Sequence, residues 1–278
     1  MAARFIDFFE PSTSRATNDP SLDNDPSLEK ARFIDYLPKV CHGLVNLEEW
    51  RSQPLEQHYE PSPTILWETV SAWENYVAER RKIFSDSRRR QRKLESELGA
   101  LTFCFDDSNP ATLAQAMAWK SEQYLASGEP DAFANAKHVA FFRALAQEKL
   151  LLISSLCADK QLLAVHIGVL ANNRLCSWVP AYDTRYRPFA PGRLLLLSLL
   201  EASFQRGHQE FDFLIGNEPY KWPYATHTRL IAALGQPPIS VRANQWLKAI
   251  AKPLLLDRLN QSPAIKTFVK TLAMRLEA

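Results

Sequence analysis

The chain has 278 residues, 46% of them hydrophobic and 23% charged, and its formal net charge is +2. This length suits one large globular domain or two small ones, and the small net charge gives no global field that favours nucleic acid. The four cysteines, Cys41, Cys104, Cys157 and Cys176, lie far apart without a CxxC pair. Their spacing argues against a zinc site or a disulfide framework and fits a reducing cytosol. The apolar runs are too short for a signal peptide or a membrane span, so we expect a cytoplasmic protein.

The N-terminal region repeats itself. The pentapeptide Asn-Asp-Pro-Ser-Leu occurs at 18–22 and 24–28, and Ala-Arg-Phe-Ile-Asp occurs at 3–7 and 31–35. Few apolar residues lie between the copies, so they cannot build a core. We expect residues 1–64 to hold a mobile leader and a partial N-terminal segment.

The next part of the chain has a helical pattern. Residues 62–98 are predicted to be helical, with Ser71 and Glu74 as a capping box and Gly99 at the end. The basic run at 80–93 is either a solvated helix face or a surface for a phosphate-rich partner or membrane. A strand at 101–105 and two further helices follow, one opening at Asn109-Pro110 and ending at Gly128, the other spanning about 131–149.

The pattern then changes to strands. Three strands are predicted, at 150–156, 161–170 and 174–182, with turns at 158–160 and at Asn172-Asn173. A helix over 192–206 crosses to a strand at 210–215, and 221–234 has room for one more strand pair. An antiparallel meander followed by a helix crossover predicts a mixed α/β sheet. The tail, residues 236–278, is predicted to be helical; from 240 on it carries seven basic and two acidic residues, a net of +5.

Pro191-Gly192 opens the crossover helix. A helix N-terminus offers unpaired N–H groups to a diphosphate, Gly192 permits close approach, and Arg187 and Arg193 can neutralise its charge. The alternative is an ordinary Pro-Gly helix start with two solvated arginines.

Asp212 lies between two phenylalanines in the last strand and either faces a cleft or is tied to a neighbouring donor. Acyl transfer from a thioester to an amine needs a base that takes the ammonium proton and an acid for the departing thiolate. After Asp212, Glu218 is a candidate for the base and Tyr220 a candidate for the acid. Lys221 is a candidate for binding an anionic acceptor. The alternative is that Tyr220 packs and Lys221 is solvated.

The histidines show no metal-ligand spacing. His166 stands in an apolar strand and is expected to be a core or cleft residue, so no metal is predicted.

The segment from Pro191 to Lys221 resembles the CelD/BcsL-like branch of the GNAT acetyltransferases, which is associated with bacterial cellulose and exopolysaccharide production. The resemblance rests on Pro191-Gly192-Arg-Leu-Leu and on Asp212-Phe213-Leu214-x-Gly216-x-Glu218-Pro219-Tyr220-Lys221. It covers roughly residues 65–230. The chain departs from the branch at Ile215, where Arg is usual, and at Asn217, where an acidic residue is usual, and it has a shortened N-terminal half.

The resemblance implies a GNAT-like, mainly antiparallel sheet flanked by helices over residues 65–235. It implies acetyl-CoA or another acyl-CoA as co-substrate and an amine-bearing small molecule or sugar as acceptor. The resemblance gives a reaction class and not a mechanism. The candidate site residues for that reaction are Asp212, Glu218 and Tyr220 for catalysis, Tyr182, Arg187, Gly192 and Arg193 for the cofactor, and Asn217 and Lys221 for the substrate. Strand N–H groups beside Tyr182 are expected to polarise the thioester carbonyl.

Two other functions remain open. The departures favour a catalytically silent partner of a membrane polysaccharide synthase, with peripheral contact at the inner membrane. The basic run and the similarity to Fem-type transferases, which share the doubled GNAT plan, favour aminoacyl-tRNA-dependent transfer.

Overall fold

A computed structural model describes residues 36–52, 59–235 and 243. The chain divides into two units, one of Met1–Glu10 with His42–Ile231 and one of Pro11–Cys41 with Ala232–Ala278. Almost all described residues belong to the first unit. The repeated leader at 1–35 and, apart from Ala243, the tail at 236–278 lie outside the described residues. The predicted domain boundaries stay predictions.

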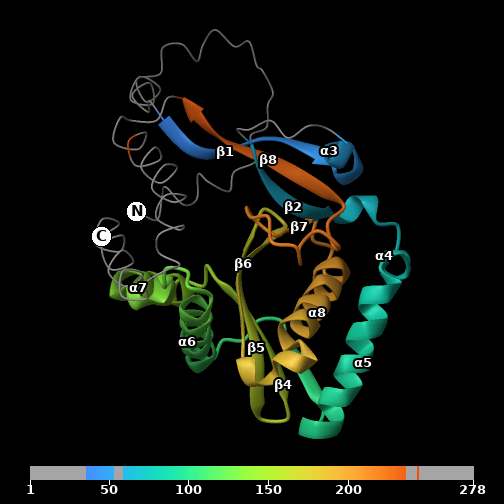
Figure 1. Cartoon of the computed structure of the whole chain (residues 1–278), viewed down its shortest axis with the longest axis vertical. Helices are drawn as coiled ribbons and strands as arrows, with labels where there is room; N and C mark the ends of the chain where they lie inside the picture. Colours follow the sequence, from blue (N-terminus) through green and yellow to red (C-terminus); the bar gives the residue numbers. More distant parts are fainter. Residues whose placement is uncertain (1–35, 53–58, 236–242, 244–278) are drawn as a thin grey trace, which may run out of the picture. The chain divides into compact units, whose positions relative to one another are not determined.

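The described strands form one eight-stranded sheet with the order β1-β8-β2-β7-β6-β5-β4-β3 (Figure 1). The strands are β1 (Tyr36–Asn46), β2 (Glu60–Leu66), β3 (Leu101–Cys104), β4 (Leu152–Ala158), β5 (Gln161–Ala171), β6 (Arg174–Tyr182), β7 (Glu210–Asp212) and β8 (His227–Gly235). The α-helices are α3 (Leu47–Ser52), α4 (Trp73–Glu79), α5 (Arg81–Leu98), α6 (Pro110–Ser127), α7 (Ala136–Gln147) and α8 (Pro191–Gln205). The 3₁₀ turns are Trp67–Thr69, Ala132–Ala134 and Thr184–Phe189. From β8 to β3 in this order the pairing is antiparallel except between β6 and β7, so the predicted mixed, mainly antiparallel sheet is confirmed.

The meander β4–β5–β6 follows from local turn chemistry. Asp159 in the first turn, and Asn172 and Asn173 in the second, have φ values of 48°, 50° and 59°. Asp and Asn tolerate this left-handed conformation better than other non-glycine residues, and tight hairpins require it. The predicted strands and both turns are therefore confirmed.

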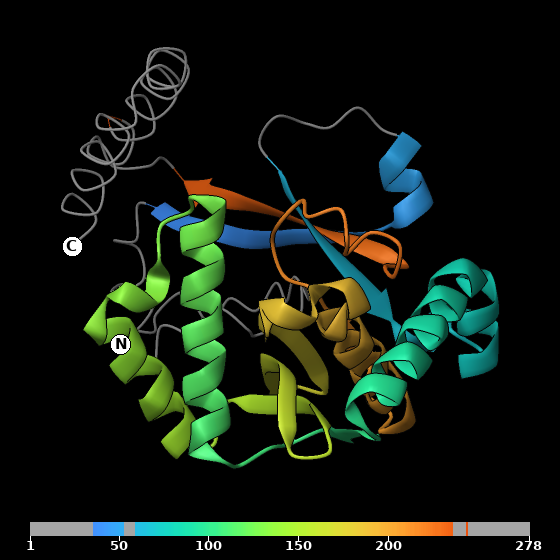
Figure 2. The same cartoon turned by 60° about the horizontal axis from the view of Figure 1, so that its bottom comes forward.

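Helices cover both faces of the meander. In Figures 1 and 2, α6 and α7 lie on one side of β4–β6, and α5 and α8 lie on the other. Val165, Ile167, Val179 and Ala181 pack against α6 and α7, in one buried cluster with Phe142. Leu163 and Ala164 pack on the opposite face with residues of α5 and α8.

Helix α6 begins as its sequence predicts. Pro110 occupies the first turn, and the Asn109 side chain accepts a hydrogen bond from the Ala111 N–H at 3.0 Å. The helix ends at Gly128, whose φ of 77° is the left-handed conformation that terminates helices.

Two predictions before residue 100 are wrong. The segment predicted as helix from residue 62 begins with β2, which pairs with both β7 and β8 and buries Ser62, Thr64 and Ile65 completely. Distant strands supply its partners, so the pattern of the segment does not reveal them. Ser71 does not cap a helix: Ala72 precedes α4 without a side-chain cap, and the Ser71 hydroxyl accepts from the Asn75 side chain instead.

Near the C-terminal end of the unit, the predicted strand at 210–215 stops at Asp212, because Leu214 has a left-handed φ of 58°. The predicted strand pair at 221–234 is one strand, β8, whose partner β2 comes from much earlier in the chain.

Candidate active site

Strands β6 and β7 separate soon after they pair. Their parallel register has three steps, from Arg174 opposite Glu210 to Cys176 opposite Asp212. Strand β7 then ends, whereas β6 continues along β5 to Tyr182, with a register shift opposite Ile167 and Gly168. Beyond Cys176, the edge of β6 that faces away from β5 is therefore open to a ligand.

A cavity of about 570 Å³ lies along this open edge. Strands β5 and β6, helices α5, α6 and α8, the turn at 184–190 and the loop at 220–224 contribute its wall. The lining residues are Ile83, Lys120, Gln123, Val165, His166, Ser177, Pro180, Ala181, Tyr182, Arg187, Ala190, Gly192, Arg193, Leu195, Leu196, Tyr220, Pro223 and Tyr224.

The first turn of α8 reaches the cavity at Gly192. Pro191 has no N–H, and the N–H groups of Arg193 and Leu194 donate to the Ala190 carbonyl at 2.9 and 3.2 Å. Gly192 thus supplies the backbone donor that this turn can offer to a ligand. A Cβ on Gly192 would lie 3.2 Å from Cδ1 of Tyr182, so the glycine also lets that ring pack against the helix start.

The two predicted arginines differ in their surroundings. Arg193 is half-buried, and its guanidinium lies 3.0 Å from the Asp86 carboxylate. Hydrogen bonds from Arg90 and Arg89 hold the pKa of Asp86 well below its usual range, so this carboxylate stays charged. Arg187 is exposed at the cavity wall.

The backbone of Tyr182 faces the open edge. The Asp183 N–H donates to Leu163 of β5 at 2.9 Å, and neighbouring residues of a strand alternate in direction, so the Tyr182 N–H points away from β5. The Tyr182 carbonyl accepts from the Gln123 side chain at 3.1 Å, as this direction requires. Pro180, two residues earlier, has no N–H to contribute.

The loop after β7 is held by Lys221. Only 4% of this side chain is exposed, and Nζ lies 3.2 Å from the Ile215 carbonyl and 2.8 Å from the Glu218 carboxylate. Asn217 accepts from Nε1 of Trp222 at 3.0 Å. These contacts fix the loop from inside, and none of the three predicted residues Asn217, Glu218 and Lys221 is among those that line the cavity.

Tyr220 reaches the cavity from this loop. Its side chain is 44% exposed, and burial, with the Glu218 charge as a second cause, raises its pKa to about 12. At neutral pH the phenol is therefore protonated and able to donate.

Asp212 lies beneath the loop and not in the cavity lining. It is 4% exposed, and it accepts from the Ser62 hydroxyl at 3.0 Å and from the Leu214 N–H at 2.8 Å. Burial raises its pKa, with the Glu210 charge as the second cause. Of the two possibilities from sequence, this is the geometry of a carboxylate tied to neighbouring donors.

The structure thus brings Tyr182, Arg187, Gly192, Arg193 and Tyr220 to one cavity. It adds residues that the sequence does not single out for a site, above all Lys120 and Ser177. His166, expected to lie in the core or a cleft, is also part of the lining. The change from a helical to a strand pattern near residue 150 predicts the strands, but no local sequence pattern indicates that Lys120 of α6 lines the cavity.

His166 is a neutral polar group in this wall. It is 3% exposed, its Nε2 lies 2.8 Å from the Ser177 hydroxyl, and its Nδ1 has no partner among the described residues. Burial lowers its pKa to about 3. Gly168 makes room for the ring, because a Cβ there would lie 2.8 Å from Cε1 of His166.

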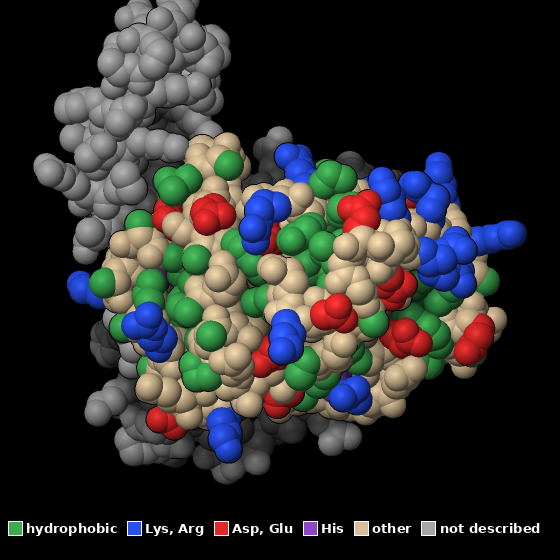
Figure 3. Space-filling view, turned by 90° about the horizontal axis from the view of Figure 1, so that it is seen from below, with side chains coloured by type: hydrophobic (Ala, Val, Ile, Leu, Met, Phe, Trp, Pro, Cys, Tyr) green, Lys and Arg blue, Asp and Glu red, His purple; other side chains and the backbone are tan. Residues whose placement is uncertain are grey.

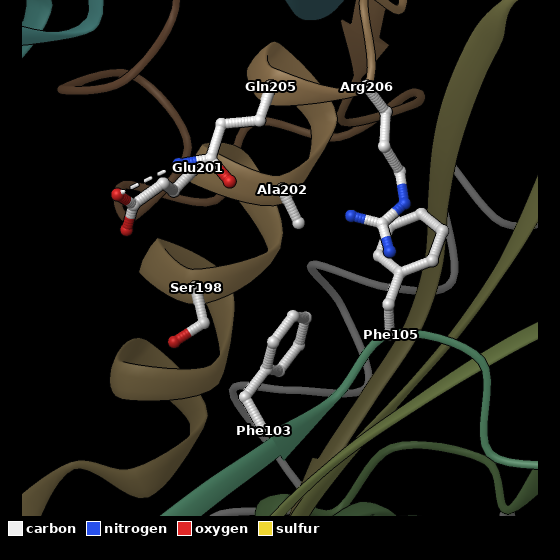
Figure 4. Close-up of a pocket in the computed structure, with 7 residues that line it drawn as sticks. All are labelled: Phe103, Phe105, Ser198, Glu201, Ala202, Gln205 and Arg206. Atoms are coloured by element: carbon white, nitrogen blue, oxygen red, sulfur yellow. Dashed lines mark hydrogen bonds between the residues drawn. The ribbon is translucent and has the colours of Figure 1, made fainter.

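A second, more open hollow of about 360 Å³ lies beside the C-terminal half of α8. Figure 4 shows Arg206 lying over the ring of Phe105, with 3.9 Å from the guanidinium carbon to the ring centroid. Glu201 and Gln205 hydrogen-bond to each other along the helix at 3.3 Å. None of the predicted site residues lies there.

The basic run forms part of α5. Figure 3 shows Lys and Arg side chains gathered over this helix, with acidic side chains nearby. Several contacts of the run are internal: Arg90 donates to the Pro188 carbonyl, Arg80 to the Pro223 carbonyl, and Lys93 lies 5.5 Å from the Phe189 ring centroid. Part of the run thus holds the segments that frame the cavity.

Within residues 36–52 and 59–235, no group of His, Cys, Asp and Glu side chains is arranged to hold a metal ion. Among the same residues, no helix has the length and apolar character that crossing a membrane requires.

The chain is similar to several solved structures at low sequence identity. The chain resembles the L-PGS structure from Bacillus licheniformis, with 10% identity over 80% of this chain and 69% of that one and a TM-score of 0.46. It resembles a FemX structure, with 10% identity over 75% and 67% and a TM-score of 0.47. A conserved protein of unknown function from Bacteroides thetaiotaomicron gives 12% identity over 75% of each chain and a TM-score of 0.46. No curated protein matches.

Residues 80–222, more than half of the chain, match the family described as Acetyltransferase (GNAT) domain. The matched range includes β3 to β7, both sides of the open edge and the loop that carries Tyr220. GNAT domains use an acyl-CoA co-substrate. This chain belongs to the GNAT acetyltransferase family and is an acyltransferase.

Proposed function

We propose that this enzyme transfers an acetyl group from acetyl-CoA to the amine of a sugar or similar small molecule. The observation that carries the proposal is the cavity of about 570 Å³ at the separation of β6 and β7, in contact with Gly192 of α8. Arg187, Arg193 and the Gly192 N–H are the groups suited to a diphosphate, because all three are donors and two are cations.

The chemistry follows from the donors around the open edge. Acyl-CoA, when bound, supplies a thioester-activated acyl group. The Tyr182 N–H is the backbone donor for its carbonyl oxygen, since Pro180 has none. Tyr220, protonated at neutral pH, donates the proton that the departing sulfur takes up.

The remaining predicted residues act around this pair. Glu218 lies outside the cavity lining, so we propose that it takes the ammonium proton through a water. Lys221 and Asn217 fix the loop that presents Tyr220 to the acceptor. Asp212 positions the same loop at its start, through the Leu214 N–H.

A link to cellulose or exopolysaccharide production is the finer part of the proposal. Its support is the resemblance of residues 191–221 to the CelD/BcsL-like branch. It predicts that amino sugars accept the acetyl group. A thiol-release assay with acetyl-CoA and matched amino sugars, amino acids and polyamines tests this, and transfer confined to acceptors that are not sugars would contradict it.

Isothermal titration of the full chain with acetyl-CoA tests the central proposal. We expect saturable heat at micromolar to millimolar ligand and roughly tenfold weaker binding in Arg187→Gln, which loses one charged donor to phosphate. Arg92→Gln removes the same charge from an exposed position on α5 and serves as the matched control. Absence of heat at millimolar acetyl-CoA would overturn the proposal.

A further inference from the structure

The charged groups of the cavity wall have one sign. Lys120, Arg187 and Arg193 line it, and no Asp or Glu is among the lining residues. Two carboxylates outside the lining are already paired: Asp86 with Arg193 at 3.0 Å and Glu218 with Lys221 at 2.8 Å. A cationic molecule would therefore find no counter-charge in the lining, whereas an anionic one would meet Lys120 and Arg187.

The three cations lie on two sides of the sheet. Arg187 and Arg193 accompany the first turn of α8, where the proposed function places a diphosphate. Lys120 belongs to α6, and Figure 2 shows α6 (light green) on the other side of β4–β6 from α8 (gold). Lys120 is thus separate from the groups that suit the diphosphate.

Lys120 is a partly buried charge that lacks an ion-pair partner within the described part of the chain. Its Nζ lies 5.0 Å from the ring centroid of Tyr124. Burial lowers its pKa, and the Glu218 charge acts in the opposite direction. A partly desolvated ammonium group is stabilised when an anion reaches it, which favours ligands that carry one.

On the basis of the proposed function, we propose that Lys120 binds a carboxylate or phosphate group of the acyl acceptor and so selects anionic acceptors over neutral and cationic ones. This transfers to Lys120 the acceptor-binding role that the sequence suggested for Lys221, whose ammonium group is occupied by the loop carbonyls. His166 and Ser177 in the same wall are neutral partners for the uncharged polar groups of such an acceptor.

The test uses the full chain saturated with CoA and titrated with three amino sugars. Glucosamine 6-phosphate carries a phosphate, muramic acid a carboxylate, and glucosamine neither. We expect at least one anionic sugar to bind at least tenfold more tightly than glucosamine, and the stronger of the two identifies the group. Lys120→Gln is expected to remove that preference, whereas Lys120→Arg keeps most of it.

Two controls distinguish a failure of the role of Lys120 from a failure of the proposed acetyl-CoA-dependent function. Lys137→Gln removes an exposed charge on α7 and should leave the preference intact. The affinity for CoA itself should change less than twofold in Lys120→Gln; a larger loss would assign Lys120 to CoA and overturn the inference. Equal binding of charged and uncharged sugars, or no sugar binding by a protein that binds CoA, would also overturn it. Failure to bind CoA would instead remove the proposed function.

Discussion

His166 combines complete burial with a hydrogen bond to a neutral partner. In the native state it stays neutral down to a pKa of about 3, whereas in the unfolded chain it takes up a proton near pH 6.5. A group whose folded pKa is depressed in this way binds protons more readily when unfolded. Stability is therefore lost as pH falls below the unfolded value, and the loss ends near the folded value.

This difference predicts a measurable acid sensitivity. Between pH 7 and pH 5, His166 alone is expected to lower the free energy of unfolding by about 2 kcal/mol. Urea unfolding at both pH values checks this, with His166→Gln as the comparison, since Gln is polar but does not titrate. His208 and His227, whose pKa values burial also lowers, remain in both proteins. An equal loss in wild type and variant would show that His166 is not the source.

Tyr220 permits a second residue-scale prediction. Removing its hydroxyl in Tyr220→Phe takes away the proposed acid while leaving the ring in the cavity wall. We expect kcat to fall by roughly 10²- to 10⁴-fold, with little change in the affinity for acetyl-CoA. Tyr186→Phe, on the turn before α8, is the control outside the cavity lining. Unchanged kcat in Tyr220→Phe would assign the proton transfer to another group.

At the scale of elements, the packing of Tyr182 against the start of α8 depends on the absence of a Cβ at Gly192. In Gly192→Ala the new Cβ would lie 3.2 Å from Cδ1 of Tyr182, so the ring has to move by a few tenths of an ångström. Because the Tyr182 N–H and the Gly192 N–H are both proposed to contact acyl-CoA, we expect weaker acetyl-CoA binding with unchanged helix content. Titration calorimetry and circular dichroism measure the two effects.

The size of the side chain should grade the effect. Gly192→Val is expected to weaken binding more than Gly192→Ala, because the Val methyl groups extend further toward the Tyr182 ring. Ser198→Ala, two turns along the same helix, should change neither quantity. Equal affinity in all four proteins would separate Gly192 from the ligand.

The elements differ in how far the sequence could foretell them. The β4–β5–β6 hairpins, α6 and α8 carry their signals locally, in Asp and Asn turns, an Asn cap and a Pro-Gly start. Strand β2 does not: Pro61 and Pro63 stand in its first half, and its partners lie about 150 to 170 residues further on. Part of the site is unpredictable for the same reason. Lys120 lines the cavity because of tertiary packing, and the residue pattern within α6 does not indicate this.

At the scale of the folded unit, one buried carboxylate links four strands around the open edge. Glu210 of β7 is 5% exposed, and it contacts Arg174 of β6, Arg229 of β8 and the Thr64 hydroxyl of β2. The ion pair between Glu210 and Arg174 lies at the first of the three register steps that join β6 to β7. The network therefore fixes the point from which these two strands separate.

Removing the Glu210 carboxylate should loosen the point where β6 and β7 separate and should also destabilise the core. Glu210→Ala removes the carboxylate that pairs with the mostly buried Arg174 and Arg229, while the Asp212 carboxylate stays 3.9 Å from Arg229; the change is expected to cost roughly 3 kcal/mol in the free energy of unfolding. Acetyl-CoA affinity should also fall, although Glu210 is not among the residues that line the cavity. Urea unfolding and calorimetry at a temperature where the variant remains folded measure both. Glu97→Ala, at an exposed site on α5, controls for loss of a negative charge. A variant that is destabilised yet binds acetyl-CoA with wild-type affinity would show that the separation of β6 and β7 is held by the paired backbones alone.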